Sequence, residues 1–133
     1  MITERSIDGV DASGNRADWE IKALAKKGFS DIKLIDKFDK TKLSDISDYL
    51  IHAQQLSGRL LDNSRYIVDA HGLEYVHDNY LSQGYPIYSW KQWAFRAKSY
   101  HYKKLENKIF KNSLHVICAG ESIYERVKNI QTA

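Results

Sequence analysis

The sequence has few of the features that mark secreted or membrane-spanning proteins. It contains a single cysteine, Cys118, among 133 residues, which rules out an intrachain disulfide and fits a reducing compartment. No run of about 18 apolar residues is present, which is the length a membrane-spanning helix needs. Glu4, Asp8 and Asp11 lie near the N-terminus, where a signal peptide would carry an apolar segment. We therefore expect a cytoplasmic protein.

Several common catalytic motifs are also absent. The chain has no G-x-S-x-G, H-E-x-x-H, G-x-G-x-x-G or P-loop motif and no paired C-x-x-C. Cys118 lies inside the apolar run Leu114–Ala119, where burial disfavours the reactive thiolate. These absences argue against a serine hydrolase, a zinc protease of that motif and a cysteine nucleophile.

The remaining composition fits one globular domain over residues 1–133. Hydrophobic residues make up 43% and charged residues 28% of the chain. The alternation of apolar and turn-forming segments predicts a helix at Asp18–Lys27 and strands at Phe29–Phe38 and Ser47–Gln54. It further predicts a loop at Met1–Asn15, a short helix at Gln55–Leu61, a strand at Tyr66–Ala70, an irregular segment at His71–Ser89, a helix at Trp90–Asn112, a strand at Leu114–Ala119 and a last helix over Ser122–Asn129. Strands that alternate with helices indicate an α/β fold with a mainly parallel sheet in a three-layer αβα arrangement.

The most informative segment is the strand that ends in Asp69-Ala70-His71-Gly72. In open α/β sheets, ligands bind just beyond the carboxyl ends of the strands. Asp69 and His71 are two residues apart and should point to the same face, where they could orient each other, bind a hydroxyl-rich ligand or coordinate a metal. His77 and Asp78 would enlarge such a metal cluster. The alternative is a purely structural pair in which Asp69 caps a turn.

Two further segments could contribute to the same edge of the sheet. His52 ends the preceding apolar strand, so it would face the same rim as His71 if the two strands are parallel neighbours; a structural histidine is the alternative. The Gly9–Gly14 loop precedes the first helix, where backbone amides can approach a phosphate. An ordinary flexible loop is the alternative there.

A basic and aromatic segment follows the irregular region. Trp90–Lys111 contains seven basic residues against the single acid Glu106, and aromatic residues are interleaved with them. This composition suits an anionic membrane surface, or, less favourably, single-stranded nucleic acid; a solvated helix face is the alternative. Within the segment, an apolar spacing of three and four residues predicts one buried stripe made of Trp90, Trp93, Ala94, Ala97, His101, Leu105 and Ile109.

Taken in order, these features resemble the N-terminal, acceptor-side domain of a GT-B glycosyltransferase of the GT4 type. The resemblance covers roughly residues 14–128. It rests on Leu24-Ala25-Lys26-Lys27-Gly28-Phe29, Asp48–Gln54, Val68-Asp69-Ala70-His71-Gly72, and the passage from Leu105-Glu106 to Phe110-Lys111-Asn112-Ser113-Leu114-His115-Val116-Ile117. The chain departs from the family pattern in its short, polar Met1–Ile7, in Ser13-Gly14 where the family has Gly-Gly, and in Gly120 where the family has Ser.

The resemblance implies a Rossmann-like domain that faces a second one across a cleft. Such enzymes transfer a sugar from a nucleotide-sugar donor to an acceptor hydroxyl, usually with retention, and the N-terminal domain mainly binds the acceptor, which is often lipid-linked. His71 would be the catalytic residue near the donor sugar, and Asp69, Gly72 and His52 would line the substrate site. The Gly9–Gly14 loop, with Gly14 and Asn15, would lie near the donor phosphates. Neither a metal nor a cofactor is implied.

The resemblance also bears on what surrounds the chain. The C-terminal domain, which carries the nucleotide pocket and the paired glutamates of the E-x7-E motif, is not in this sequence, so we expect a fragment of a longer protein that does not catalyse transfer alone. The basic segment suggests the inner face of a membrane. Two alternatives remain: a metal-dependent phosphoesterase, whose G-D and G-N-H motifs do not follow His71, and a non-catalytic module that binds membrane or nucleic acid.

Overall fold

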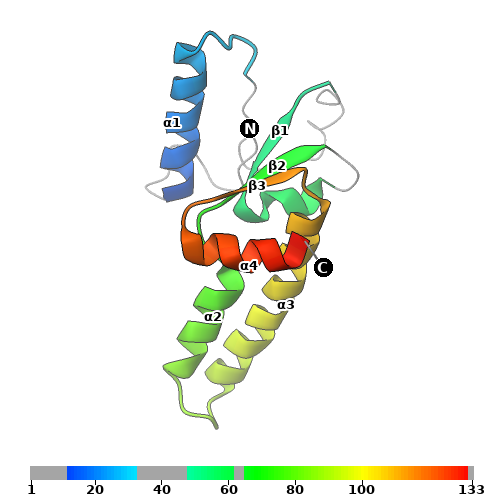
Figure 1. The fold of residues 1–133 in the computed structure, drawn as a ribbon. Coiled ribbons are helices and arrows are strands. Elements are labelled where there is room, and N and C mark those ends of the chain that lie inside the picture. Colours follow the sequence, from blue (N-terminus) through cyan, green and yellow to red (C-terminus); the bar gives the residue numbers. More distant parts are fainter. Residues whose placement is uncertain (1–11, 33–47, 62–64, 132–133) are drawn as a thin grey trace.

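The computed structural model describes residues 12–32, 48–61 and 65–131. This part of the chain forms a mixed α/β fold with a three-stranded parallel sheet and four α-helices (Figure 1). The elements are α1 (Ala12–Lys26), β1 (Ile51–Gln54), the 3-10 helix η2 (Gln55–Leu60), β2 (Tyr66–Ala70), α2 (Glu74–Gln83), α3 (Trp90–Asn112), β3 (His115–Cys118) and α4 (Glu121–Gln131). The order of strands and helices confirms the α/β class and the parallel sheet.

The sheet has the order β1-β2-β3 with β2 in the centre. Ala53 pairs with Val68, which in turn pairs with Val116 on β3. Successive side chains of a strand point to opposite faces, so this row and its even-spaced neighbours form one apolar face. Gln54 and Asp69 form the adjacent row and point to the other face.

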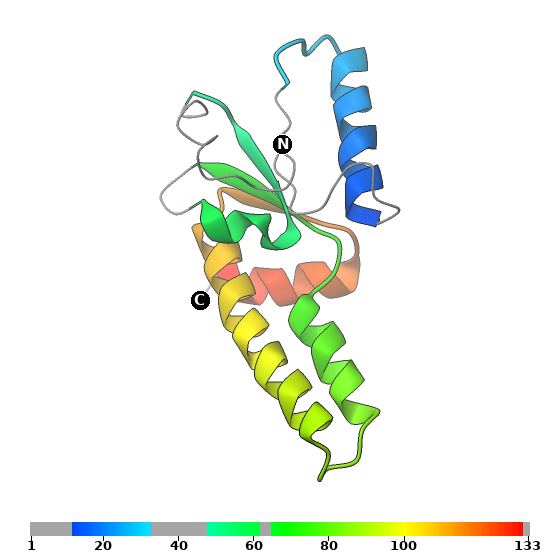
Figure 2. The same cartoon turned by 180° about the vertical axis from the view of Figure 1, so that it is seen from behind.

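The hydrophobic core lies on the apolar face. Val68 and Ala53 are fully buried there and cluster with Leu61, which directly follows η2, with Ile109 of α3 and with Val127 of α4. The hydroxyl of Tyr66, at the start of β2, donates to the carbonyl of Ile109 at 3.0 Å and so fixes the end of α3 beneath the sheet. In both views α1 stands on the other side of the sheet from α2, α3 and α4 (Figures 1 and 2).

Helices α2 and α3 form an antiparallel pair that extends away from the sheet (Figure 1). The expected buried stripe of α3 is wrong over most of its length: Trp90 is 74% exposed and Trp93 58%, and Ala94, Ala97 and His101 are exposed as well. The buried positions are instead Gln92, Ser99 and Glu106, spaced by seven, followed by Ile109 and Phe110. Two of these polar side chains bond to backbone groups of α2: the Ser99 hydroxyl donates to the carbonyl of Tyr75 at 2.7 Å, and Glu106 accepts from the N–H of Glu74.

Other boundaries differ from the sequence prediction. The segment expected to be irregular contains α2, which has a weak apolar pattern of its own and is held by α3. Helix α1 begins at Ala12, earlier than predicted. Phe29–Ile32 form no strand, and the rest of the strand predicted at Phe29–Phe38 lies outside the described residues, as does most of the predicted N-terminal loop.

The predicted helix Trp90–Asn112 and strand Tyr66–Ala70 match α3 and β2 residue for residue. The predicted helix at Gln55–Leu61 is present as η2, and the strands at the two edges are shorter than predicted. Within the described ranges, no helix is both long enough and apolar enough to cross a bilayer.

Gly58 lies where η2 crosses the core face of the sheet, and an added methyl group has no room there. A Cβ at this position would come within 2.8 Å of the Ile109 Cγ2 atom and 3.3 Å of Tyr66 Cε2. We expect Gly58→Ala to lower the free energy of unfolding by about 1–3 kcal/mol, measured by urea denaturation. Gly120→Ala is the control, because nothing lies within 4 Å of its Cβ position. Equal effects of the two substitutions would contradict this packing.

Candidate functional site

The polar face of the sheet carries the candidate site near the carboxyl ends of β1 and β2. Gln54 pairs with Asp69 in the register of the two strands, and His52 lies two residues before Gln54 on the same face. His71 follows directly after β2. The parallel pairing therefore places Asp69, His71 and His52 on one face of the sheet, as expected, but His52 is the second residue of β1 and does not lie at the strand end that the sequence predicts.

Asp69 and His71 form the centre of the site. Asp69 is fully buried, and its Oδ1 atom lies 3.4 Å from Nδ1 of His71. The His71 side chain is 17% exposed, and neither of its ring nitrogens makes a hydrogen bond within the described ranges. A carboxylate beside one ring nitrogen can orient an imidazole.

Helix α1 contributes Glu20, a residue the sequence analysis did not identify. The Oε2 atom of Glu20 lies 3.4 Å from Nδ1 of His52 and accepts a hydrogen bond from Nε2 of Gln54 at 3.1 Å. Glu20 lies three residues after Ala17, which is fully buried, so both residues share the face of α1 that is turned inward. That spacing was a usable signal, but a lone glutamate on a short amphipathic helix gives no indication of its partner.

The residues that could hold a metal ion are Glu20, His52 and Asp69. One ligand atom from each lies within 4.8 Å of the others, and the two from Glu20 and His52 are 3.4 Å apart. Two ligands about 2.0–2.1 Å from a tetrahedral zinc ion would be about 3.3 Å apart, so the set has a suitable size for one ion. The predicted enlargement of the cluster by His77 and Asp78 is wrong: His77 is exposed, and Asp78 pairs with Lys98 at 3.3 Å.

The remaining predicted site residues lie at the margins of this cluster. Gly72 follows His71, and Leu73 alone separates it from α2. Gly14 and Asn15 lie in the first turn of α1 and not in a loop before it, so the helix begins earlier than expected. Backbone N–H groups in a first turn have no partners within the helix, so Gly14 and Asn15 still belong to a helix N-terminus. Gly9–Asp11 lie outside the described residues.

Glu106 of α3 fixes the segment that follows His71. Its Oε1 atom accepts a hydrogen bond of 2.7 Å from the backbone N–H of Glu74, the first residue of α2. Leu73, at the N-cap position, has no side-chain acceptor for this amide, so Glu106 supplies the cap from another helix. Burial raises the pKa of Glu106 to about 7, while the backbone N–H groups of Glu74 and Tyr75 act in the opposite direction.

Cys118 ends β3 beside the site. Burial, and secondarily the charge of Asp69, raises the pKa of its thiol above the usual value. A raised pKa keeps the thiol protonated and therefore a poor nucleophile, in agreement with the sequence prediction.

A pocket of about 410 Å³ lies between α2 and α4, next to the end of β2. It is lined by Leu73, Val76, His77 and Tyr80 from the α2 side and by Ser122, Ile123 and Arg126 from α4. Leu73 lies two residues after His71 along the chain, but the two helices that form the pocket lie on the other side of the sheet from α1, which carries Glu20 (Figures 1 and 2).

Comparison of the chain with protein-family models, with curated proteins and with solved structures finds no match. The assignment of function therefore depends on the residues and geometry of the site.

The raised pKa of Glu106 predicts a pH-dependent stability. Its folded-state pKa of about 7 lies above the ordinary glutamate value of 4.5, so the stabilisation due to its protonation is complete below about pH 4.5 and is lost as the pH rises through 7. We expect Glu106→Gln, which can still accept the Glu74 hydrogen bond, to remove this dependence. Urea denaturation of both proteins at about pH 5 and about pH 8 should show the variant gaining relative to the parent at the higher pH, by at most about 3 kcal/mol. A difference independent of pH would contradict the prediction.

Proposed function

We propose that this chain is the acceptor-side domain of a glycosyltransferase that transfers a sugar from a nucleotide-sugar donor to an acceptor hydroxyl. In this proposal the domain is Rossmann-like, and a second domain of the GT-B type supplies the nucleotide pocket. The observation that carries the proposal is His71, which stands at the carboxyl end of the central parallel strand with its Nδ1 atom 3.4 Å from the buried carboxylate of Asp69.

The chemistry of this pair suits sugar transfer. An imidazole held by a carboxylate can donate a hydrogen bond to a sugar hydroxyl and stabilise charge that develops as the diphosphate leaves. The N-terminus of α1, with Gly14 and Asn15, would stabilise the departing phosphates, because helix N-termini favour anions. His52 and Gly72 would complete the lining of the sugar site, and the pocket between α2 and α4 would hold part of the acceptor.

The cluster of Glu20, His52 and Asp69 bears on the alternative of a metal-dependent phosphoesterase. Phosphoesterases of the two-metal class hold two ions about 3.5–4 Å apart and need ligands for both. The described ranges offer a single group of three ligands, and His77 and Asp78 do not join it. The described residues therefore offer ligands for one ion and not for the two of such a phosphoesterase; in the proposed glycosyltransferase, Glu20 and His52 serve each other as partners.

Substitution of His71 tests the proposal directly. The complete gene product should transfer labelled sugar from a nucleotide-sugar to a hydroxyl acceptor in a membrane lipid extract. We expect His71→Ala to lower kcat by about 10²–10³, the usual effect of removing a hydrogen-bond donor from developing charge. His115→Ala is the matched control, since His115 is an exposed histidine at the far end of β3. Transfer at the parental rate by His71→Ala would refute the role of His71, and an absence of transfer from every nucleotide-sugar would refute the proposal.

Zinc titration separates the glycosyltransferase from the metal-dependent phosphoesterase. We expect calorimetry with Zn²⁺ to show no tight, saturable binding, because the proposed transfer uses no metal at this cluster and Glu20 already accepts a hydrogen bond from Gln54. Stoichiometric binding that His52→Ala abolishes would instead favour the phosphoesterase.

A further inference from the structure

The end of the α2–α3 pair exposes an unusual amount of apolar and aromatic surface. Ile87 is 68% exposed, Tyr88 87%, Trp90 74% and Trp93 58%. These residues lie within one turn and the start of α3, at the end of the pair that is farthest from the sheet (Figure 1). Single exposed apolar residues are common on protein surfaces, but a contiguous group of large ones marks an interaction surface.

The exposed side chains are held outward by an ordered turn. The indole N–H of Trp93 donates to the carbonyl of Ile87 at 3.0 Å, and the backbone N–H of Ser89 donates to the carbonyl of Pro86 at 2.8 Å. The Ser89 hydroxyl accepts the backbone N–H of Lys91 at 3.3 Å and so caps α3. Ile87, Tyr88 and Trp90 are therefore exposed in a turn whose backbone is held by hydrogen bonds.

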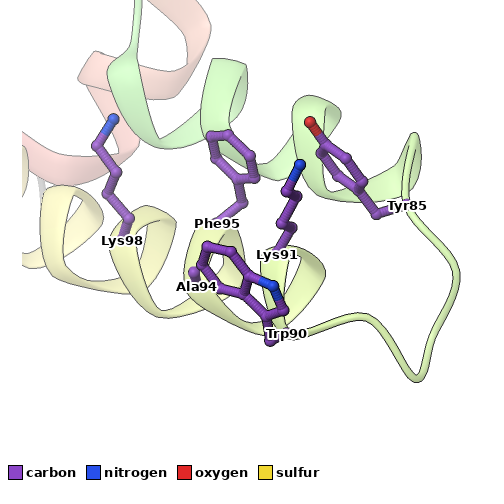
Figure 3. A pocket seen from close by; sticks show the side chains of 6 residues that line it. All are labelled: Tyr85, Trp90, Lys91, Ala94, Phe95 and Lys98. Carbon is purple, nitrogen blue, oxygen red and sulfur yellow. The ribbon is translucent and has the colours of Figure 1, made fainter.

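Cations lie immediately behind the aromatic tip. Lys91 stands 5.7 Å from the ring centre of Tyr85, and Arg96 stands 5.7 Å from that of Trp93. Figure 3 shows Lys91 and Lys98 extending from α3 on the side that also carries the ring of Phe95, which stacks on Tyr85 at 5.8 Å. Together these groups surround a pocket of about 310 Å³ whose lining residues are Tyr85, Trp90, Lys91, Ala94, Phe95 and Lys98.

The positive charge continues along the whole of α3. All seven of its basic side chains are exposed: Lys91, Arg96, Lys98, Lys103, Lys104, Lys108 and Lys111. The single acid of the helix, Glu106, is buried against α2 and adds no negative charge to the exposed surface. The helix pair therefore has an apolar end followed by a positively charged shaft.

We propose that the end of the α2–α3 pair, residues 85–98, docks on an anionic phospholipid bilayer. Ile87, Tyr88 and Trp90 enter the interface between headgroups and acyl chains, where amphipathic aromatic rings are favoured. Lys91 and Arg96 then lie at the level of the lipid phosphates, and the rest of α3 is attracted by the negative surface potential. This inference does not depend on sugar transfer, because the surface lies at the other end of the helix pair from His71.

The arrangement fits a bilayer better than single-stranded nucleic acid. Proteins that bind single strands alternate stacking rings with cations along a groove that follows the phosphate backbone. Here the exposed tip includes Pro86 and Ile87, which can neither stack on bases nor bind phosphate, and the cations begin only at Lys91, from where they follow one helix. An apolar end with a basic collar is the arrangement that a surface with an apolar interior and anionic phosphates would complement.

Vesicle binding tests the proposal with the full chain. We expect the protein to co-sediment with vesicles of phosphatidylcholine mixed with phosphatidylglycerol and to bind vesicles of phosphatidylcholine alone at least about tenfold more weakly. Its tryptophan emission should shift to shorter wavelength on binding. Trp90→Ser should weaken binding about tenfold through lost apolar contact, and Arg96→Glu by at least as much through lost and reversed charge.

Two exposed residues of α1 provide matched controls for these variants. Trp19 is 70% exposed, so Trp19→Ser removes an equivalent indole from another surface, and Lys26→Glu reverses an exposed charge there. Both should leave vesicle binding unchanged. Equal losses in the test and control variants, equal binding to both kinds of vesicle, or tighter binding to an oligouridylate than to the anionic vesicles would each overturn the proposal. Circular dichroism of every variant establishes that a loss of binding is not a loss of fold.

Discussion

The hydrogen bond from the Glu74 amide to the Glu106 carboxyl is the contact on which the geometry around His71 depends. It joins the first residue of α2 to the middle of α3, with a donor–acceptor distance of 2.7 Å, and buries a titratable group to do so. Three residues separate β2 from α2, so fixing Glu74 also limits the positions open to His71 and Gly72. The Tyr66 hydroxyl also holds α3 to β2 through the carbonyl of Ile109. Both ends of the segment between β2 and α2, which contains His71, are therefore fixed to the same helix.

The sequence predicted the elements that carry a clear apolar pattern within their own residues. Strand β2 is an apolar run that is buried on both faces, and α3 ends at Asn112 where the helix pattern stops, so both boundaries are correct. Helix α2 was missed because its stability comes from α3: its buried residues are Asp78 and Ser82, which carry no apolar signal. Asp69 and His71 were predicted from the end of β2 and His52 from its apolar strand, whereas the spacing of Glu20 from Ala17 gives its face of α1 but not its partners, which depend on how α1 packs.

The buried face of α3 shows why an apolar pattern can mislead. Gln92, Ser99 and Glu106 recur every seven residues, the spacing of a helix–helix contact, but they are polar and so do not belong to the apolar pattern. Two of them are stabilised in the interface because they bond to backbone groups of α2, which a sequence pattern does not reveal. Trp90 and Trp93 of the same helix therefore lie on its exposed side. Packing among the described residues does not explain why large aromatic side chains occupy these positions.

The two faces of the sheet differ sharply in the polarity of the side chains that they bury. One face is covered by apolar side chains from η2, α3 and α4, and the other places Glu20, His52, Asp69 and His71 close together with little access to water. Removing such groups from water costs several kcal/mol per ion, and apolar residues of similar volume would often be at least as stable. Fold stability therefore gives no reason to hold carboxylates and imidazoles there, whereas a site that must orient an imidazole beside the carboxyl end of a parallel strand does. The aromatic end of the helix pair likewise leaves Ile87, Tyr88 and Trp90 in water, where burial within the described residues does not stabilise them.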